Sequence, residues 1–118
     1  MQATATSRFQ RGSAKKLGQI ATLVRGKDVP EALRALTFLA KPSKGPVLKT
    51  LRSAVANAIN KAGKAKLHEE DLYVAEARVD QGPALKRWRP APRGMASLIR
   101  KKTCHVHIRV ETKKEVEV

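Results

Sequence analysis

The first apolar residues that recur at helical spacing lie between Ser13 and Gly26. They are three and four positions apart, which is the period of one face of a helix. These positions are Leu17, Ile20, Ala21 and Val24. Ser13 is a suitable cap for the first turn, and Gly26 is a suitable residue to end the last one. The pattern predicts a helix here, preceded by a short strand or extended arm over Thr4 to Phe9.

Two further helices are expected before the middle of the chain. Asp28-Val29-Pro30-Glu31 has the spacing of a capping box with proline in the first turn, and it predicts a short helix that ends at Lys41-Pro42-Ser43. Its inward positions are Leu33, Leu36 and Leu39 or Ala40. The clearest helix covers about Lys44 to Lys61. Its apolar stripe is Val47, Leu51, Ala54, Val55, Ala58 and Ile59. The polar stretch from Ala62 to Glu70 is expected to be a loop.

Beyond Leu72 the apolar period changes to two, which predicts strands. On the first strand one face carries Tyr73, Ala75, Ala77 and Val79, and the other carries Val74, Glu76, Arg78 and Asp80. On the second, Cys104, Val106, Ile108 and Val110 alternate with Thr103, His105, His107 and Arg109. The segment between them, Gly82 to Lys102, has three prolines and no helix signal. The charged tail from Glu111 to Val118 is expected to fray.

Pairing of these two strands predicts an arm longer than the body that carries it. Continuous pairing from Tyr73 to a turn near Arg89 would span roughly 50 Å, at about 3.3 Å per residue. A compact domain of this length has a radius of gyration of only about 13 Å. We therefore expect one α+β domain, residues 1–118, with a long protruding β-hairpin at about 73–110 and a tip at about 84–95. Two strands alone are marginally stable, so a partner must hold the hairpin.

The charge of the chain indicates what that partner is. The sequence has 25 Lys and Arg residues against 10 Asp and Glu, a formal net charge of +15. So many like charges repel one another in the compact state. Binding to a polyanion reduces this repulsion, and a nucleic acid is the first such partner to consider. Binding to a membrane surface would need a bulky amphipathic helix or a lipid anchor, and neither pattern is evident. Without an apolar signal or membrane-spanning run, we expect a cytosolic protein, in agreement with its single cysteine, Cys104.

The predicted hairpin concentrates this charge, and between Arg78 and Lys102 its one acidic residue is Asp80. Its basic residues are Arg78, Lys86, Arg87, Arg89, Arg93, Arg100, Lys101 and Lys102. Arginine suits phosphate because its planar fork bonds two oxygens at once. Trp88 either stacks on a base or packs on the prolines of the hairpin. Those prolines, Pro83, Pro90 and Pro92, cannot donate ladder hydrogen bonds, and Gly94 permits the return of the chain.

Catalytic and metal sites are not expected. His105 and His107 share a strand face but have no evident third ligand, and strand histidines are more often structural. The cluster His68-Glu69-Glu70-Asp71 resembles an acid/base group but fits better with a solvated loop. Cys104 alternates with core residues and is expected to be a small buried hydrophobe.

The alternative to an RNA-binding protein is a DNA-architectural protein with basic β-ribbon arms. Such proteins are normally obligate dimers, and no second large apolar face is apparent.

Four blocks in order resemble the large-subunit ribosomal protein L twenty-two family of bacterial type. They are LVRGKDVPEAL (23–33), LKTLRSAVANAIN (48–60), LYVAEARVDQGPALKRWRP (72–90) and IRKKTCHVHIRV (99–110). The resemblance implies a three-stranded antiparallel sheet packed against three helices, with the hairpin inserted into large-subunit ribosomal RNA. It also implies a tip that lines the nascent-peptide exit tunnel, a body at the outer surface, a role in subunit assembly and a monomer beside neighbouring ribosomal proteins. No enzyme activity, cofactor or metal is implied.

The resemblance and the charge pattern together give two sets of candidate residues. The RNA-binding candidates are Arg8, Arg11, Lys15, Lys16, Arg25, Lys27, Lys49, Arg52, Asn57, Asn60, Arg78, Lys86, Arg87, Trp88, Arg89, Arg93, Arg100, Lys101, Lys102 and His105. The tunnel-tip candidates are Leu85, Lys86, Arg87, Trp88, Arg89, Pro90, Ala91, Pro92, Arg93 and Gly94. Among these, Leu85-Lys86-Arg87 matches the stretch where family changes affect macrolide antibiotics.

The sequence departs from the family pattern at two places. Ala91 and Met95 stand where relatives usually have basic residues, and Pro92 replaces a usual alanine. The resemblance places a role in sensing nascent chains in this stretch. These departures therefore weaken the expectation of that role for this chain. The entry to the first helix, residues 12–16, lacks the common Ser-Pro-Arg, although Lys15 and Lys16 keep the positive charge.

Overall fold

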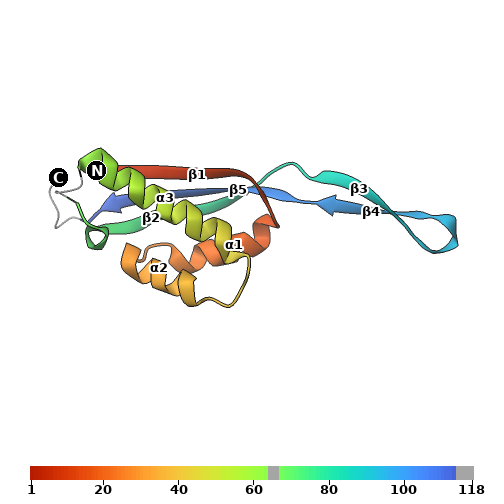
Figure 1. Cartoon of the computed structure of the whole chain (residues 1–118), viewed down its shortest axis with the longest axis horizontal. Coiled ribbons are helices and arrows are strands. Elements are labelled where there is room, and N and C mark those ends of the chain that lie inside the picture. The colour runs from red at the N-terminus through yellow and green to blue at the C-terminus, as the bar shows by residue number, and fades with distance from the viewer. Residues whose placement is uncertain (64–66, 114–118) are drawn as a thin grey trace.

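The computed structural model describes residues 1–63 and 67–113. The elements in chain order are β1 (Gln2–Arg11), α1 (Ala14–Val24), α2 (Val29–Phe38), α3 (Lys44–Ala62), the short 3-10 helix η1 (Glu69–Asp71), β2 (Leu72–Gln81), β3 (Leu85–Pro90), a second 3-10 turn η2 (Pro92–Gly94), β4 (Ala96–Lys101) and β5 (Thr103–Thr112). Strands β1, β5 and β2 form an antiparallel sheet in that order, and β3 pairs with β4. The three α-helices lie on one side of the sheet (Figure 1). This confirms the predicted α+β class.

The central strand β5 has the alternation that its sequence predicts. Cys104, Val106, Ile108 and Val110 are fully buried, whereas His105, His107 and Arg109 are only partly so. The buried set faces the helices, and the polar set faces the side of the sheet that they leave open. We call that side the open face. Because β5 pairs with β1 on one edge and β2 on the other, it is the central strand on which the core is built.

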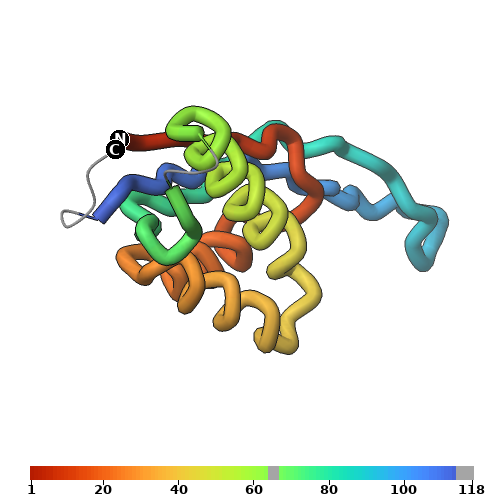
Figure 2. Tube along the Cα trace, turned by 60° about the vertical axis from the view of Figure 1, so that its left-hand side comes forward, coloured from red at the N-terminus to blue at the C-terminus, as the bar shows by residue number. Residues whose placement is uncertain are grey.

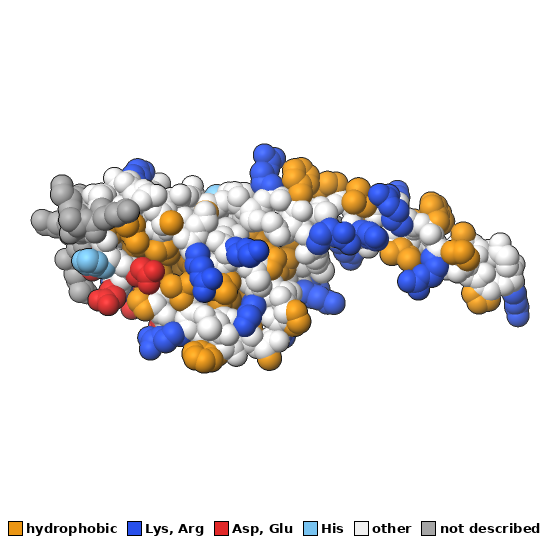
Figure 3. Space-filling view, in the orientation of Figure 1, with side chains coloured by type: hydrophobic (Ala, Val, Ile, Leu, Met, Phe, Trp, Pro, Cys, Tyr) orange, Lys and Arg blue, Asp and Glu red, His pale blue; other side chains and the backbone are white. Residues whose placement is uncertain are grey.

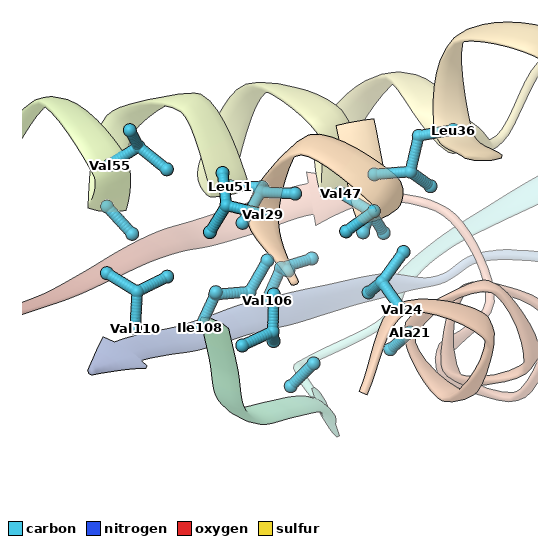
Figure 4. Close-up of a cluster of buried hydrophobic side chains, with 14 of the residues drawn as sticks. Ala21, Val24, Val29, Leu36, Val47, Leu51, Val55, Val106, Ile108 and Val110 are labelled. Carbon is cyan, nitrogen blue, oxygen red and sulfur yellow. The ribbon is translucent and has the colours of Figure 1, made fainter. Parts of the chain in front are cut away.

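The helices bury the stripes predicted for them. Helix α3 packs on β1 and β5, and α1 packs on β2. Figure 4 shows side chains of α1, α2 and α3 meeting those of β5. Each buried Leu, Ile or Val contributes about 1.5–3 kcal/mol. The inward face of α2 was only partly predicted. Val29, Ala32 and Leu36 are fully buried, but Leu33 and Leu39 are half-buried, and Ala40 is exposed.

The predicted caps mark the helix starts correctly but do not act as caps. Neither Ser13 nor Asp28 makes a side-chain hydrogen bond to its helix. The end of α1 is instead tied to the sheet. Gly26, at φ 81°, donates its N–H to Val74 O at 2.9 Å, and Val74 N–H donates to Lys27 O at 2.9 Å. These two bonds join the turn after α1 directly to β2.

The predicted faces of β2 are wrong at its start because the strand contains a bulge. The register with β5 shifts between Val74 and Glu76, which leaves Ala75 as an extra residue. A one-residue shift exchanges the two faces of a strand. Val74 is therefore buried, in contrast to its predicted place on the polar face, and Tyr73 lies on the open face. Beyond the bulge, Ala77 and Val79 point to the core as predicted.

The hairpin is divided into two ladders, and its outer part forms a protruding ribbon. We define the ribbon as β3, β4 and the turn between them. Its first pair is Leu85 with Lys101, and its last pair is Pro90 with Ala96. The chain therefore turns at Pro92–Gly94 and not near Arg89 as predicted. Arg93 and Gly94 have φ of 64° and 70° there. The molecule measures 67 × 24 × 18 Å with a radius of gyration of 17.6 Å, well above the value of about 13 Å for a compact domain (Figure 2).

The segments predicted to be irregular are partly ordered. Glu111 accepts a hydrogen bond from Tyr73 at 2.8 Å, and Lys113 forms an ion pair with Asp28 at 3.2 Å. The expected fraying is therefore wrong for residues 111–113, and residues 114–118 lie outside the described part. The predicted loop from Ala62 to Glu70 begins with the last residue of α3 and contains the buried Leu67. Its residues 64–66 are also outside the described part.

A closely packed segment joins the ribbon to the sheet. We call it the neck and define it as Gly82, Pro83, Lys102 and Thr103. Gly82 donates its N–H to Thr103 O at 3.0 Å, and the buried Thr103 hydroxyl donates to Pro83 O. Gly12 N–H donates to Lys102 O at 3.0 Å, which ties the neck to the end of β1. A Cβ atom at position 82 would lie only 2.7 Å from Thr103 Oγ1. Only glycine fits there without displacing a buried, hydrogen-bonded side chain.

Gly82→Ala is therefore expected to destabilise the protein by about 1–3 kcal/mol, the usual cost of overpacking a filled site. Thermal unfolding followed by circular dichroism should show a melting temperature several degrees lower. Gly18→Ala is the matched control, because a Cβ at this α1 position meets nothing within 4 Å. It should stabilise the helix by roughly 0.5–1 kcal/mol. Equal melting temperatures for the two variants would contradict the assigned neck geometry.

Candidate nucleic-acid interface

The ribbon and neck carry a dense and unbalanced positive charge. Residues 83–102 contain seven basic residues and no Asp or Glu. The seven, all exposed, are Lys86, Arg87, Arg89, Arg93, Arg100, Lys101 and Lys102. Figure 3 shows basic side chains along the whole ribbon. Lys86 lies directly opposite Arg100 in the ladder. Like charges in this position destabilise a strand pair, so bound anions would stabilise the ribbon.

The tip of the ribbon adds exposed apolar surface to this charge. Trp88 lies opposite Leu98 and is 69% exposed, and Met95 is 70% exposed. A shallow hollow is lined by Trp88, Arg89, Pro90, Ala91, Gly94, Met95 and Ala96. Trp88 thus borders Pro90 but keeps most of its ring accessible. Its surface remains free for stacking on a planar group.

A second group of cations surrounds the neck and the start of α1. Arg11, Arg100, Lys101 and Lys102 line an open hollow together with Gly12 and Ser13. Lys15 and Lys16 follow in the first turn of α1, and both are exposed. The positive end of a helix dipole disfavours nearby cations, so this arrangement is suited to an anion.

Of the RNA-binding candidates on α3, three have exposed side chains, and the fourth also makes a hydrogen bond within the protein. Lys49, Arg52 and Asn60 are exposed on the helix. Asn57 is also exposed, but its Nδ2 donates to Thr4 O at 3.0 Å. One turn later, Lys61 Nζ donates to Gln2 O at 3.2 Å. Asn57 therefore helps to hold α3 on β1, a role that the sequence did not reveal.

Three further candidates are occupied by contacts within the protein. Arg25 donates from Nε and Nη2 to Ala77 O, at 3.1 and 2.6 Å, and so links the end of α1 to β2. Arg78 forms ion pairs with Glu76 at 3.2 Å and Asp80 at 3.6 Å. His105 Nδ1 accepts the N–H of Phe9 at 3.0 Å. Lys27 is half-buried beside β2. RNA would have to compete with these contacts.

On the open face, positive charge is largely balanced. Arg109 lies between Glu76 and Glu111, with N···O distances of 3.7 and 3.5 Å. Tyr73 donates its hydroxyl to Glu111, and this hydrogen bond raises the pKa of Tyr73; desolvation and the Glu111 charge add to the rise, and Arg109 opposes it. The open face therefore attracts a polyanion less than the ribbon does.

The residues considered earlier as metal ligands and nucleophile, and two of the acid/base group, make contacts that stabilise the fold. His107 Nδ1 is hydrogen-bonded to Thr6 Oγ1 at 2.8 Å, and burial raises the pKa of the Cys104 thiol, which makes it a poor nucleophile. His68 and Asp71 close the short turn η1, where His68 N–H donates to Asp71 Oδ2 at 3.2 Å. Across residues 1–63 and 67–113, no three His, Cys, Asp or Glu side chains are grouped to hold a metal. No helix in the described part of the chain is long and apolar enough to cross a membrane.

Comparison with known proteins gives matches over almost the whole chain. The family model for ribosomal protein L22p/L17e matches residues 5–111. The large ribosomal subunit protein uL22 of Bdellovibrio bacteriovorus is 46% identical over 96% of this chain and 100% of its own length. The protein of the same name from Carboxydothermus hydrogenoformans is 45% identical, covering 98% and 99%, and that from Myxococcus xanthus is 44% identical, covering 92% and 94%. The chain therefore belongs to the ribosomal protein L22p/L17e family.

Proposed function

We propose that this protein is a structural component of the large ribosomal subunit that binds ribosomal RNA through its ribbon, its neck and the exposed cations of α1 and α3. The observation that carries the proposal is the ribbon together with its neck, with seven exposed cations and no carboxylate over residues 83–102. Within residues 1–63 and 67–113 these cations form no ion pair with a carboxylate, unlike Arg109 on the open face. The names of the bacterial relatives support the large subunit as the place where this charge is matched.

The ribbon presents cations on both of its sides. Directly opposed residues share a side, and neighbouring residues along a strand alternate. Lys86 and Arg100 therefore project to one side, and Arg87, Arg89 and Lys101 to the other. A single RNA strand on one side would leave the cations on the other side unmatched. We infer that the ribbon lies between RNA segments, and that it helps to hold them together during subunit assembly.

We also propose that the whole chain acts as one domain whose tip, Leu85–Gly94, lines the nascent-peptide exit tunnel. The ribbon extends along the 67 Å axis, away from the helices. This length would let the body remain at the subunit surface, as a monomer beside neighbouring ribosomal proteins, while the tip contacts the nascent polypeptide. Family membership argues against the DNA-architectural alternative that the basic ribbon alone left open.

Sedimentation of a tagged chain through a sucrose gradient tests this proposal. The tagged protein is expected to travel with large subunits and to stay with them at high salt, because an arm enclosed by RNA dissociates slowly. A tagged chain that remained at the top of the gradient would contradict the proposal. The control replaces Lys86, Arg87 and Arg89 with glutamine. It should fold, since these side chains are exposed, yet dissociate from subunits more readily as salt rises.

A further inference from the structure

Phe9 has a backbone conformation that aromatic residues rarely adopt. The register between β1 and β5 is interrupted between Ser7 and Gln10, and Phe9 lies in this bulge with φ of 57°. For a residue with a bulky side chain, such an angle requires support from the surrounding structure. Phe9 is 58% exposed and is not part of the hydrophobic core. The bulge therefore presents an aromatic side chain to solvent.

His105 and Arg8 hold this ring in a defined orientation. The N–H of Phe9 donates to His105 Nδ1 at 3.0 Å, and the two rings meet edge to face with centroids 4.9 Å apart and planes at 88°. The Arg8 guanidinium carbon lies 5.7 Å from the centroid of the Phe9 ring. The backbone and one neighbouring ring thus fix Phe9 before any ligand arrives. Preorganisation of this kind lowers the entropic cost of binding.

The ring lies where the sheet meets the basic neck. Directly after the bulge, Gln10 pairs with Cys104 and Arg11 with Thr103. Arg11 in turn lines the hollow at the base of the ribbon. An RNA strand held there by its phosphates would have its bases within reach of an exposed, oriented ring. Aromatic side chains commonly bind unpaired bases by stacking, and arginine adds charge to the contact.

We propose that Phe9 stacks on an unpaired base of the RNA strand that passes the neck, while Arg8 and Arg11 bind the adjacent phosphates. This inference rests on the proposed function and assigns a base-binding residue outside the ribbon. An isolated exposed apolar side chain is common on protein surfaces. Phe9 differs in its supported backbone, its fixed ring and its cationic surroundings.

Equilibrium binding to an in vitro transcript of large-subunit ribosomal RNA tests the stacking contact. Phe9→Leu is expected to bind about tenfold more weakly, and Phe9→Tyr should bind as the unsubstituted chain does because the ring is retained. The salt dependence of Phe9→Leu should not change, since no cation is removed. Phe38→Leu is the matched control, because Phe38 is 83% exposed on α2. Unchanged binding by Phe9→Leu, or equal weakening by Phe9→Tyr, would overturn the inference. Failure of the unsubstituted chain to bind would instead overturn the proposed function.

A fluorescence experiment tests the same contact without relying on the leucine variant. Trp88 is the one tryptophan of the chain, so the double variant Phe9→Trp, Trp88→Phe carries a single indole at position 9. Its emission is expected to be quenched by the RNA transcript and not by heparin, a polyanion without bases. Equal responses to both polyanions, or none to RNA that is shown to bind, would overturn the inference.

Discussion

Replacement of residues 83–102 with a two-residue Asn-Gly turn is expected to leave the body folded and to remove most of its affinity for ribosomal RNA. Gly82 N–H already bonds Thr103 O at 3.0 Å, so the two strands are spaced for a tight hairpin turn. The replacement removes seven cations and no core residue. In filter-binding titrations, the slope of log affinity against log salt should become shallower by as much as about five, at roughly 0.7 for each phosphate that the deleted cations neutralise.

The shape of this variant provides an independent measurement. Small-angle scattering should give a radius of gyration of about 13 Å, as for a compact domain, in place of 17.6 Å for the full chain. A full-length control in which the seven cations become glutamine separates charge from shape: it should keep the extended form and show the same weakened salt dependence. An unfolded turn variant, or an unchanged salt slope in both proteins, would contradict the assigned roles of body and ribbon.

Ile108→Ala is expected to reduce the stability of the body by about 2–5 kcal/mol, because it leaves a cavity in the core between the sheet and the helices. Ile108 is fully buried in the central strand and pairs with Ala5 and Ala77 on its two sides. Small domains are stable by only about 5–15 kcal/mol, so this reduction is a large fraction of the total. Thermal unfolding should begin at a temperature lower by about 10 °C.

Ile99→Ala is the matched control for this core substitution. Ile99 lies on β4, opposite Arg87, and is not part of the core. The same side-chain truncation there should change the melting temperature of the body by little, since the ribbon has no interior of its own. Similar destabilisation at the two positions would show that ribbon and body unfold together.

The long α3 helix and the central strand were predictable because their periods are uninterrupted. Val47 to Ala58 keep helical spacing, and Cys104 to Val110 alternate without a break. The faces of β2 were not predictable, because the bulge at Ala75 is created by pairing with β5 and has no signal in the β2 sequence. The position of the ribbon turn was missed for a similar reason. Several prolines and Gly94 allow a return, and the pairing of Pro90 with Ala96 selects one place.

The charged part of the candidate interface was visible in the sequence because a run of cations needs no tertiary information to be recognised. The internal partners of Arg25 and Asn57 were not visible, since Ala77 and Thr4 are far away along the chain. Phe9 was assigned only to an arm or strand. A single ring in a short segment gives no periodic signal, and its orientation depends on His105, a residue 96 positions later.

The ribbon continues into the middle of the sheet and not only into its edge. Strand β4 is followed, after Lys102, by β5, which has a hydrogen-bonded strand on each side. In Figure 1 the two strands run nearly along one line. A force on the apex along this line therefore loads two ladders in shear, so that many hydrogen bonds resist together. An edge strand loaded in the same direction would have only one ladder to resist the force. The arm is therefore anchored through the strand whose side chains Val106, Ile108 and Val110 are buried in the core.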